Sequence, residues 1–279
     1  MLKKEIKSID NKISVDGIEK FYTNDSSLYN LSYKLYSNPH NRGTILFLYG
    51  FGGNLLMATL LEPYITKDYS LLLVDYPGHC YSPPSIPFSL EKLNKSIDAL
   101  LSKLGIDSCL LVGYSFGGII ALDFINRYKN RVKKLLLLNT VPNFCPNIFK
   151  RWFYELFEIM LNLNYKFFMN YIAIPILTDS HFNKELLKTS REVFAYSDPD
   201  SVKDNFNKII YLDYSKELEN IECETFLVSC QLDMVTTTKA MRKYGKRIKN
   251  SQFLTIKGYG HLILASGPEI VGKIIVECL

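Results

Sequence analysis

The fold is decided by residues 110–122, which read LLVGYSFGGIIAL. An apolar run ends in Gly113-Tyr114-Ser115-Phe116-Gly117, and a helix-like run follows it. This is Gly-x-Ser-x-Gly in the order strand, turn, helix, which holds the serine on a strained turn beside the free N–H groups of a helix N-terminus. The pentapeptide alone also fits a tight turn without chemistry, so Ser115 needs partners elsewhere in the chain.

Composition is that of an ordinary globular protein. The chain has 279 residues, of which 47% are hydrophobic and 22% charged, and its formal net charge is +5. This mild charge does not indicate nucleic acid binding. The richest basic stretch, residues 242–249, fits the solvated face of a surface helix, and no nucleic-acid module accompanies it.

The cysteines and termini give little sign of secretion. None of the six cysteines (Cys80, Cys109, Cys145, Cys223, Cys230 and Cys278) forms Cys-x-x-Cys or a zinc-binding cluster, so we expect reduced core residues and no metal. The N-terminus lacks an apolar signal core, and charges interrupt the apolar stretch 152–177. We expect a cytoplasmic protein without a transmembrane segment.

Apolar runs alternate with helical patterns along most of the chain. Continuous apolar runs, typical of buried parallel strands, cover 44–49, 71–75, 109–112, 134–138, 225–229 and 252–256. Helical patterns cover 55–65, 89–104, 116–129, 239–249 and 268–277, and two alternating stretches, 21–24 and 31–37, predict antiparallel strands; residues 1–20 read as a tail or first edge strand. The prediction is an α/β protein with a doubly wound, mostly parallel sheet of about eight strands.

The alternation breaks after the sixth strand. Residues 141–215 contain no clear buried strand but carry aromatic side chains at helix-like intervals, whereas residues 1–140 and 216–279 form the α/β core. An insertion that leaves the carboxyl end of a strand can roof the crevice where ligands bind, so we expect a helical lid over an apolar pocket. The same aromatics would also suit the core of a small helical subdomain. The expected pocket residues are Tyr49, Tyr114, Trp152, Phe153, Phe157 and Phe168.

A nucleophilic serine needs a base and a carboxylate that orients the base. Of the four histidines, His261 follows the last strand-like run and is flanked by glycines, which places it at the same rim as Ser115; His40, His79 and His181 lack that position. Asp233 follows the run 225–229 and is the expected carboxylate, although it would also suit a helix N-cap. Asp123 and Asp213 follow no buried strand and are weaker candidates.

The expected oxyanion donors are two backbone N–H groups. One belongs to Phe116, the residue after Ser115, and the other to Phe51 in the glycine-rich loop Gly50-Phe51-Gly52-Gly53-Asn54. This loop lacks the Gly-Lys-Ser/Thr that would follow in a phosphate-binding loop.

Together these pieces resemble the α/β-hydrolase superfamily, and within it the lidded serine hydrolases of esterase and lipase type. The order Ser115, Asp233, His261 matches the order of nucleophile, acid and histidine in that family. Two positions depart from its pattern: Tyr49 stands where a histidine commonly precedes the first glycine of the oxyanion segment, and Cys80 replaces the last glycine of the Asp-x-x-Gly-x-Gly loop. A serine nucleophile disfavours epoxide hydrolases and haloalkane dehalogenases, which carry aspartate there.

The resemblance implies cleavage of a carboxylic ester or thioester through an acyl-enzyme, without metal or organic cofactor, on a small to medium apolar acyl or aryl substrate. Three alternatives remain open. Lys150, Arg151 and Lys166 of the lid suit an acidic acyl carrier protein that presents the substrate. The same triad also serves carbon–carbon bond hydrolases and lyases, and some members of the superfamily are non-enzymatic small-molecule receptors.

Overall fold

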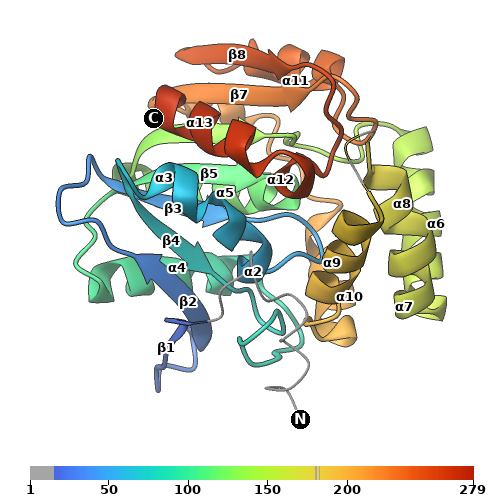
Figure 1. Ribbon diagram of the computed structural model, residues 1–279, viewed down its shortest axis with the longest axis horizontal. Coiled ribbons are helices and arrows are strands. Elements are labelled where there is room, and N and C mark those ends of the chain that lie inside the picture. Colours follow the sequence, from blue (N-terminus) through green and yellow to red (C-terminus); the bar gives the residue numbers. More distant parts are fainter. Residues whose placement is uncertain (1–15, 180, 182) are drawn as a thin grey trace.

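A computed structural model describes residues 16–279 except 180 and 182 (Figure 1). Its central sheet has eight strands in the order β1-β2-β4-β3-β5-β6-β7-β8. The strands are β1 (Glu19–Phe21), β2 (Leu31–Tyr36), β3 (Thr44–Leu48), β4 (Ser70–Val74), β5 (Cys109–Tyr114), β6 (Val132–Leu138), β7 (Glu224–Cys230) and β8 (Ser251–Ile256). The pairs β1–β2 and β2–β4 are antiparallel, and the other neighbours are parallel. The expected mostly parallel sheet of about eight strands is therefore confirmed.

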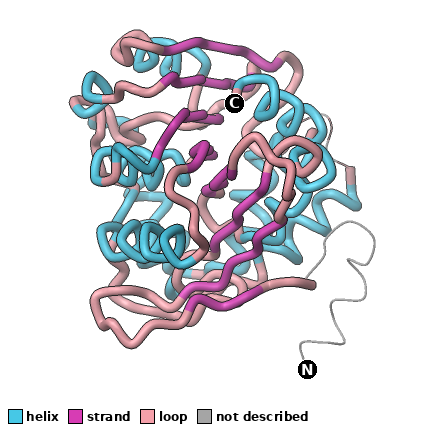
Figure 2. The backbone as a smooth tube through the Cα atoms, turned by 90° about the vertical axis from the view of Figure 1, so that its left-hand side faces the viewer, coloured by secondary structure: helices cyan, strands magenta, loops and turns pink. Residues whose placement is uncertain are grey.

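Helices cover the sheet on both sides (Figure 2). Outside the segment between β6 and β7 they are α2 (Leu55–Ala58), η2 (Thr59–Leu61), α3 (Glu62–Ile65), α4 (Leu90–Lys103), α5 (Phe116–Arg127), η3 (Lys129–Arg131), η5 (Glu217–Asn220), α11 (Thr238–Gly245), α12 (Ile263–Ser266) and α13 (Pro268–Cys278). Helix α13 packs against α3 on the near side of the sheet in Figure 1, and α4 packs against α5. Every residue of β4 and β5 is buried, as their continuous apolar sequence requires.

Two elements differ from the sequence-based expectation. The first strand covers Glu19–Phe21 rather than 21–24, because the chain turns at Thr23, whose hydroxyl accepts from the Asp25 N–H while the Asp25 carboxylate accepts from Ser27 N–H. The helical pattern 55–65 is split into α2, η2 and α3, with Pro63 in the first turn of α3. Of the tail expected at 1–20, residues 1–15 lie outside the described part.

Helices fill the chain between β6 and β7: α6 (Ile148–Leu163), α7 (Tyr165–Phe168), the π-helix η4 (Met169–Ala173), α8 (Ile174–Leu177), α9 (Lys184–Phe194) and α10 (Pro199–Ile209). They gather at one side of the molecule, on the right of Figure 1. The two ends of this helical insertion meet, since Tyr214 N–H donates to the Pro142 carbonyl (2.9 Å) and Asn143 pairs with Asp213. Its treatment as a separate lid, with boundaries 141 and 215, stays a proposal.

The turn between β5 and α5 depends on a glycine. A Cβ atom on Gly117 would lie 2.2 Å from the Leu48 carbonyl oxygen and 2.5 Å from that of Tyr49. Only glycine lets the first turn of α5 lie against the end of β3. This close approach brings the loop after β3 next to Ser115.

The six cysteines are free thiols; Cys109, Cys230 and Cys278 are buried, as core residues are expected to be, whereas Cys80, Cys145 and Cys223 are half-buried. In the described residues, no helix combines the length and apolar character needed to cross a membrane.

Candidate active site

Ser115 stands between β5 and α5 with φ 53° and ψ −121°. A positive φ is costly for a residue with a side chain and is typical of a strained functional turn. Backbone hydrogen bonds hold this conformation: the Ser115 N–H donates to the Leu138 carbonyl, and its own carbonyl accepts from Gly118 N–H, both at 2.9 Å. The serine hydroxyl is thus presented at the carboxyl end of the sheet.

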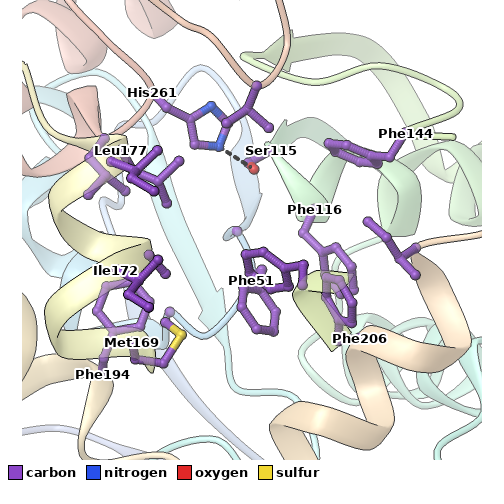
Figure 3. A pocket seen from close by; sticks show the side chains of 18 of the residues that line it. Phe51, Ser115, Phe116, Phe144, Met169, Ile172, Leu177, Phe194, Phe206 and His261 are labelled. Atoms are coloured by element: carbon purple, nitrogen blue, oxygen red, sulfur yellow. Dashed lines mark hydrogen bonds between the residues drawn. The ribbon is translucent and has the colours of Figure 1, made fainter. Parts of the chain in front are cut away.

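The structure brings Ser115, His261 and Asp233 together although they are far apart in sequence. His261 Nε2 lies 2.8 Å from Ser115 Oγ, and His261 Nδ1 lies 2.7 Å from Asp233 Oδ2 (Figure 3 draws the first contact). All three residues are buried. Asp233 follows β7 and His261 follows β8, so parallel neighbouring strands end at the same edge and place both loops beside Ser115.

Hydrogen bonds fix the orientation of Asp233. Its Oδ1 accepts from the N–H groups of Val235 and Thr236, and its Oδ2 accepts from the Thr236 hydroxyl at 2.6 Å. Burial raises the pKa of Asp233, but the charge of His261 and the hydrogen bonds from His261 and Thr236 outweigh burial, so the pKa lies below its ordinary value. The group stays ionised and holds one tautomer of the imidazole. The N-cap of α11 is Thr237 rather than Asp233.

Two residues hold the backbone of His261: Tyr114, which the sequence predicted only as a pocket residue, and Asn139, which it did not predict. The Tyr114 hydroxyl donates to the His261 carbonyl at 2.5 Å, so the residue before the serine also reaches the histidine loop. Asn139, buried and with φ 44°, donates its side-chain amide to the carbonyls of Gly260 and His261 (3.3 Å each) and accepts from Cys230 N–H (2.8 Å). An asparagine directly after β6 was the only sequence signal for this role.

The glycine-rich loop after β3 lies against the serine. A Cβ atom on Gly50 would be 3.1 Å from the Ser115 Cβ. Across the described residues, neither the Phe51 N–H nor the Phe116 N–H donates to an acceptor of the protein. Two unengaged backbone donors therefore flank Ser115, and their role as an oxyanion hole stays a prediction.

Tyr49, which stands where a histidine is common in the family, links the loop after β3 to the loop after β4. Its ring is buried, its hydroxyl lies 3.3 Å from Asp75 Oδ1 and accepts from Tyr76 N–H, and its carbonyl accepts from the Tyr76 hydroxyl. Asp75 Oδ1 also accepts from Leu55 N–H at 2.8 Å. Burial raises the pKa of Asp75 to about 8. The loop after β3 is thus joined to the loop after β4 by tyrosine hydroxyls.

Cys80 occupies a glycine-like conformation, with φ 47°. This agrees with the family pattern, in which glycine stands at that position. The cysteine adopts the same turn at some cost in backbone strain.

A cavity of about 320 Å³ opens beside Ser115 and His261. Phe51, Phe116 and Phe206 lie on one side of it, and Met169, Ile172 and Phe194 on another (Figure 3). Among the described residues, its lining contains no acidic or basic side chain other than His261. Of the expected pocket residues, five line the cavity: Tyr49, Tyr114, Phe153, Phe157 and Phe168.

Trp152 departs from that expectation. It is 72% exposed and does not line the cavity. Successive helical residues point about 100° apart, so the side of α6 that buries Tyr154 and Leu161 turns Trp152 outward. Helical spacing does not say which face a lid turns toward the core, so several lining residues were not predictable from the sequence, notably Met169, Ile172, Phe194 and Phe206.

The remaining candidates lie away from Ser115. His40 is exposed in a turn, His79 is buried with Nδ1 3.1 Å from the Pro77 carbonyl, and His181 pairs with Asp179. Asp123 accepts hydrogen bonds from three side chains that include Tyr214, and Asp213 pairs with Asn143 across the ends of the insertion.

Fold and site together define an α/β-hydrolase. The sequence profile described as the alpha/beta hydrolase fold matches residues 43–268, and the chain belongs to that family. It is therefore an enzyme of the α/β-hydrolase class.

Curated relatives include a pimeloyl-[acyl-carrier protein] methyl ester esterase of Nitrosospira multiformis, 22% identical over 74% of this chain and 82% of the relative. Another is the proline iminopeptidase PfmaB of Pestalotiopsis fici, 22% identical over 74% of this chain and 80% of the relative. Among solved structures, a thermophilic esterase from Thermogutta terrifontis matches with a TM-score of 0.82 at 21% identity, covering 93% of this chain and 97% of the other. At this identity the structural match establishes the fold.

Proposed function

We propose that the protein is a serine hydrolase that cleaves a neutral carboxylic ester or thioester with an apolar acyl or aryl group. The observation that carries this proposal is the hydrogen-bonded series Ser115–His261–Asp233, with distances of 2.8 and 2.7 Å, at the wall of an apolar cavity. Nucleophile, base and orienting carboxylate have the separations that acyl transfer requires.

The chemistry follows from these positions. His261 Nε2 takes the proton from Ser115 as Oγ attacks the substrate carbonyl carbon, and Asp233 stabilises the imidazolium. The N–H groups of Phe51 and Phe116 stabilise the oxyanion of the tetrahedral intermediate. His261 then donates the proton to the leaving alcohol or thiol, and water releases the acyl group from Ser115 by the same route.

The cavity supports a neutral substrate. A carboxylate or ammonium group on the acyl chain would lose its hydration without gaining an ionic partner, which costs several kcal/mol. We expect p-nitrophenyl butyrate to hexanoate to be hydrolysed faster than an ester of the same length that ends in a carboxylate, by roughly a hundredfold or more in kcat/KM.

The decisive experiment compares Ser115→Ala with wild type on these esters. We expect kcat to fall at least about a thousandfold and a fluorophosphonate to label the wild type but not the variant. Ser37→Ala, in an exposed loop after β2, is the matched control. Ser115→Ala activity within tenfold of wild type would reject the proposal, and labelling without turnover of any ester would favour the receptor alternative. Product analysis on candidate diketones tests the carbon–carbon hydrolase alternative.

A carrier-protein-linked substrate is a second candidate, because a relative bears the name of an esterase that acts on pimeloyl-acyl carrier protein methyl ester. The alkyl chain of such a carrier-linked substrate would suit the apolar cavity. If charge reversal at Lys150 and Arg151 leaves turnover of a carrier-bound ester unchanged, this candidate is excluded.

A further inference from the structure

The outer face of α6 and α7 is apolar and exposed. Phe149, Trp152, Leu156, Ile159 and Leu163 follow one another at intervals of three and four residues along α6, and Phe167 continues the row on α7. Such spacing aligns side chains on one side of a helix. Phe149 is 81% exposed, and Leu163 is 80% exposed. We call these six residues the α6–α7 face.

This face lies at the outer edge of the molecule. In Figure 1, α9 and α10 lie between it and the sheet, so its residues contribute nothing to the central core. The inward side of α6 is made by other residues, among them the buried Tyr154 and Leu161. Isolated exposed apolar residues are common on proteins, but a continuous row of six marks an interaction surface.

Charges around the face favour an anionic partner. Glu155 is ion-paired with Arg151, and Glu158 accepts a hydrogen bond from the Tyr211 hydroxyl. Over the described residues, Lys150 and Lys166 form no ion pair. Glu158 keeps its negative charge, so the row of apolar side chains is accompanied by three cations (Lys150, Arg151 and Lys166) and two carboxylates (Glu155 and Glu158), a positive surplus. The two lysines have long stems that reach past an apolar surface.

The face also continues into the cavity. Leu156 belongs to both, and the exposed Phe153 and Ile176 line the cavity as well. An apolar molecule leaving a surface in contact with the α6–α7 face would reach Ser115 without first crossing a polar region of the insertion.

We propose that the α6–α7 face docks on an anionic phospholipid surface, with Phe149, Trp152 and Leu163 inserted at the headgroup level and Lys150 and Lys166 against the phosphates. An amphipathic helix with aromatic and aliphatic residues on one side and lysines at its border binds membrane interfaces in this way. The wide apolar row favours lipid over an acidic carrier protein, whose recognition depends on charge. Docking does not require catalysis, so it is independent of the proposed hydrolase activity.

The test is co-sedimentation of the full chain with vesicles of phosphatidylcholine alone or with one quarter phosphatidylglycerol. We expect wild type and Ser115→Ala to bind the anionic vesicles equally. Phe149→Ser and Trp152→Ser should each weaken binding roughly tenfold or more, and Lys150→Glu and Lys166→Glu should each weaken it about fivefold or more. Phe149 and Trp152 do not line the cavity, so hydrolysis of a soluble short ester should be unchanged in their variants and reports intact folding.

Matched controls lie on other parts of the surface. Tyr22→Ser removes a ring that is 64% exposed beside β1, and Lys243→Glu reverses a charge on α11. Both should bind like wild type. The proposal is overturned if wild type sediments with neither vesicle or if the controls lose binding equally. It is likewise overturned if the face variants dissociate a dimer of the wild type. An acidic acyl carrier protein that binds through this face, while vesicles do not, would also overturn it.

Discussion

The Asp179 carboxylate accepts a hydrogen bond of 2.8 Å from the N–H of Gly260, the residue that precedes His261. Its side chain is almost fully buried and also accepts from the Ser266 hydroxyl and the His181 N–H. The helical insertion therefore holds one side of the histidine loop, while Tyr114 and Asn139 of the core hold the other.

This arrangement predicts that Asp179 positions His261. Asp179→Ala should lower kcat by roughly tenfold to a hundredfold with little change in KM, because a small displacement of the base from Ser115 is costly. Asp179→Asn keeps an acceptor for Gly260 N–H and should recover most of the activity. Steady-state kinetics on a short ester measures both. Equal losses in the two variants, accompanied by reduced thermal stability, would instead indicate a purely structural role.

Tyr114 should act on the same loop from the core side. Tyr114→Phe preserves the ring beside the cavity but removes the hydrogen bond to the His261 carbonyl. We expect kcat/KM to fall about threefold to tenfold, the range that one hydrogen bond contributes. In the double variant Tyr114→Phe/Asp179→Ala, the loss of activity should differ from the sum of the two single losses, expressed as free energies, because both changes act on one loop. Strict additivity of the two in a double-mutant cycle would contradict a shared role.

Gly117→Ala tests the close approach of α5 to β3. The new methyl group would meet backbone oxygens of Leu48 and Tyr49 that cannot move aside like a flexible side chain. We expect a loss of about 2 kcal/mol or more in the free energy of unfolding, measured by urea denaturation. Gly105→Ala is the matched control for local space, since a methyl group there meets nothing within 4 Å, although its positive φ adds some strain. A smaller loss for Gly117→Ala than for Gly105→Ala would contradict the packing argument.

The burial of His79 leads us to expect that part of the protein's stability is lost in acid. Burial lowers the pKa of His79 to about 4, whereas the unfolded chain binds this proton below about pH 6.5. Stabilisation from neutral His79 is complete above pH 6.5 and is lost as the pH falls toward 4, by about 2 kcal/mol between pH 6.5 and 4.5. His79→Gln should lack this component.

Urea denaturation of wild type and His79→Gln at pH 6.5 and 4.5 measures this acid-sensitive component of the free energy of unfolding. Asp75, whose pKa is raised to about 8, is present in both proteins, so its opposite pH dependence cancels in the difference. Identical pH dependence in wild type and His79→Gln would show that folding does not shift the pKa of His79.

Much of the fold and the candidate site followed from local patterns. The buried strands could be predicted because strands covered on both faces are continuously apolar. Ser115, Asp233 and His261 could be proposed together because each follows such a strand. The loops were harder to predict. The boundaries of β1 depended on hydrogen bonds of Thr23 and Asp25, and the outward position of Trp152 depended on how α6 packs.

By itself, the sequence determined the α/β architecture and the strand ends that carry Ser115, Asp233 and His261, because hydrophobic periodicity and the parallel order of the strands bring those ends to one edge. Only the tertiary structure decided which groups hold His261 in place and which face of α6 meets solvent. Tyr114, Asn139 and Asp179 reach His261 and Gly260 across more than 80 residues of sequence. Such contacts depend on side-chain direction and helix rotation in the folded chain, which have no local signature.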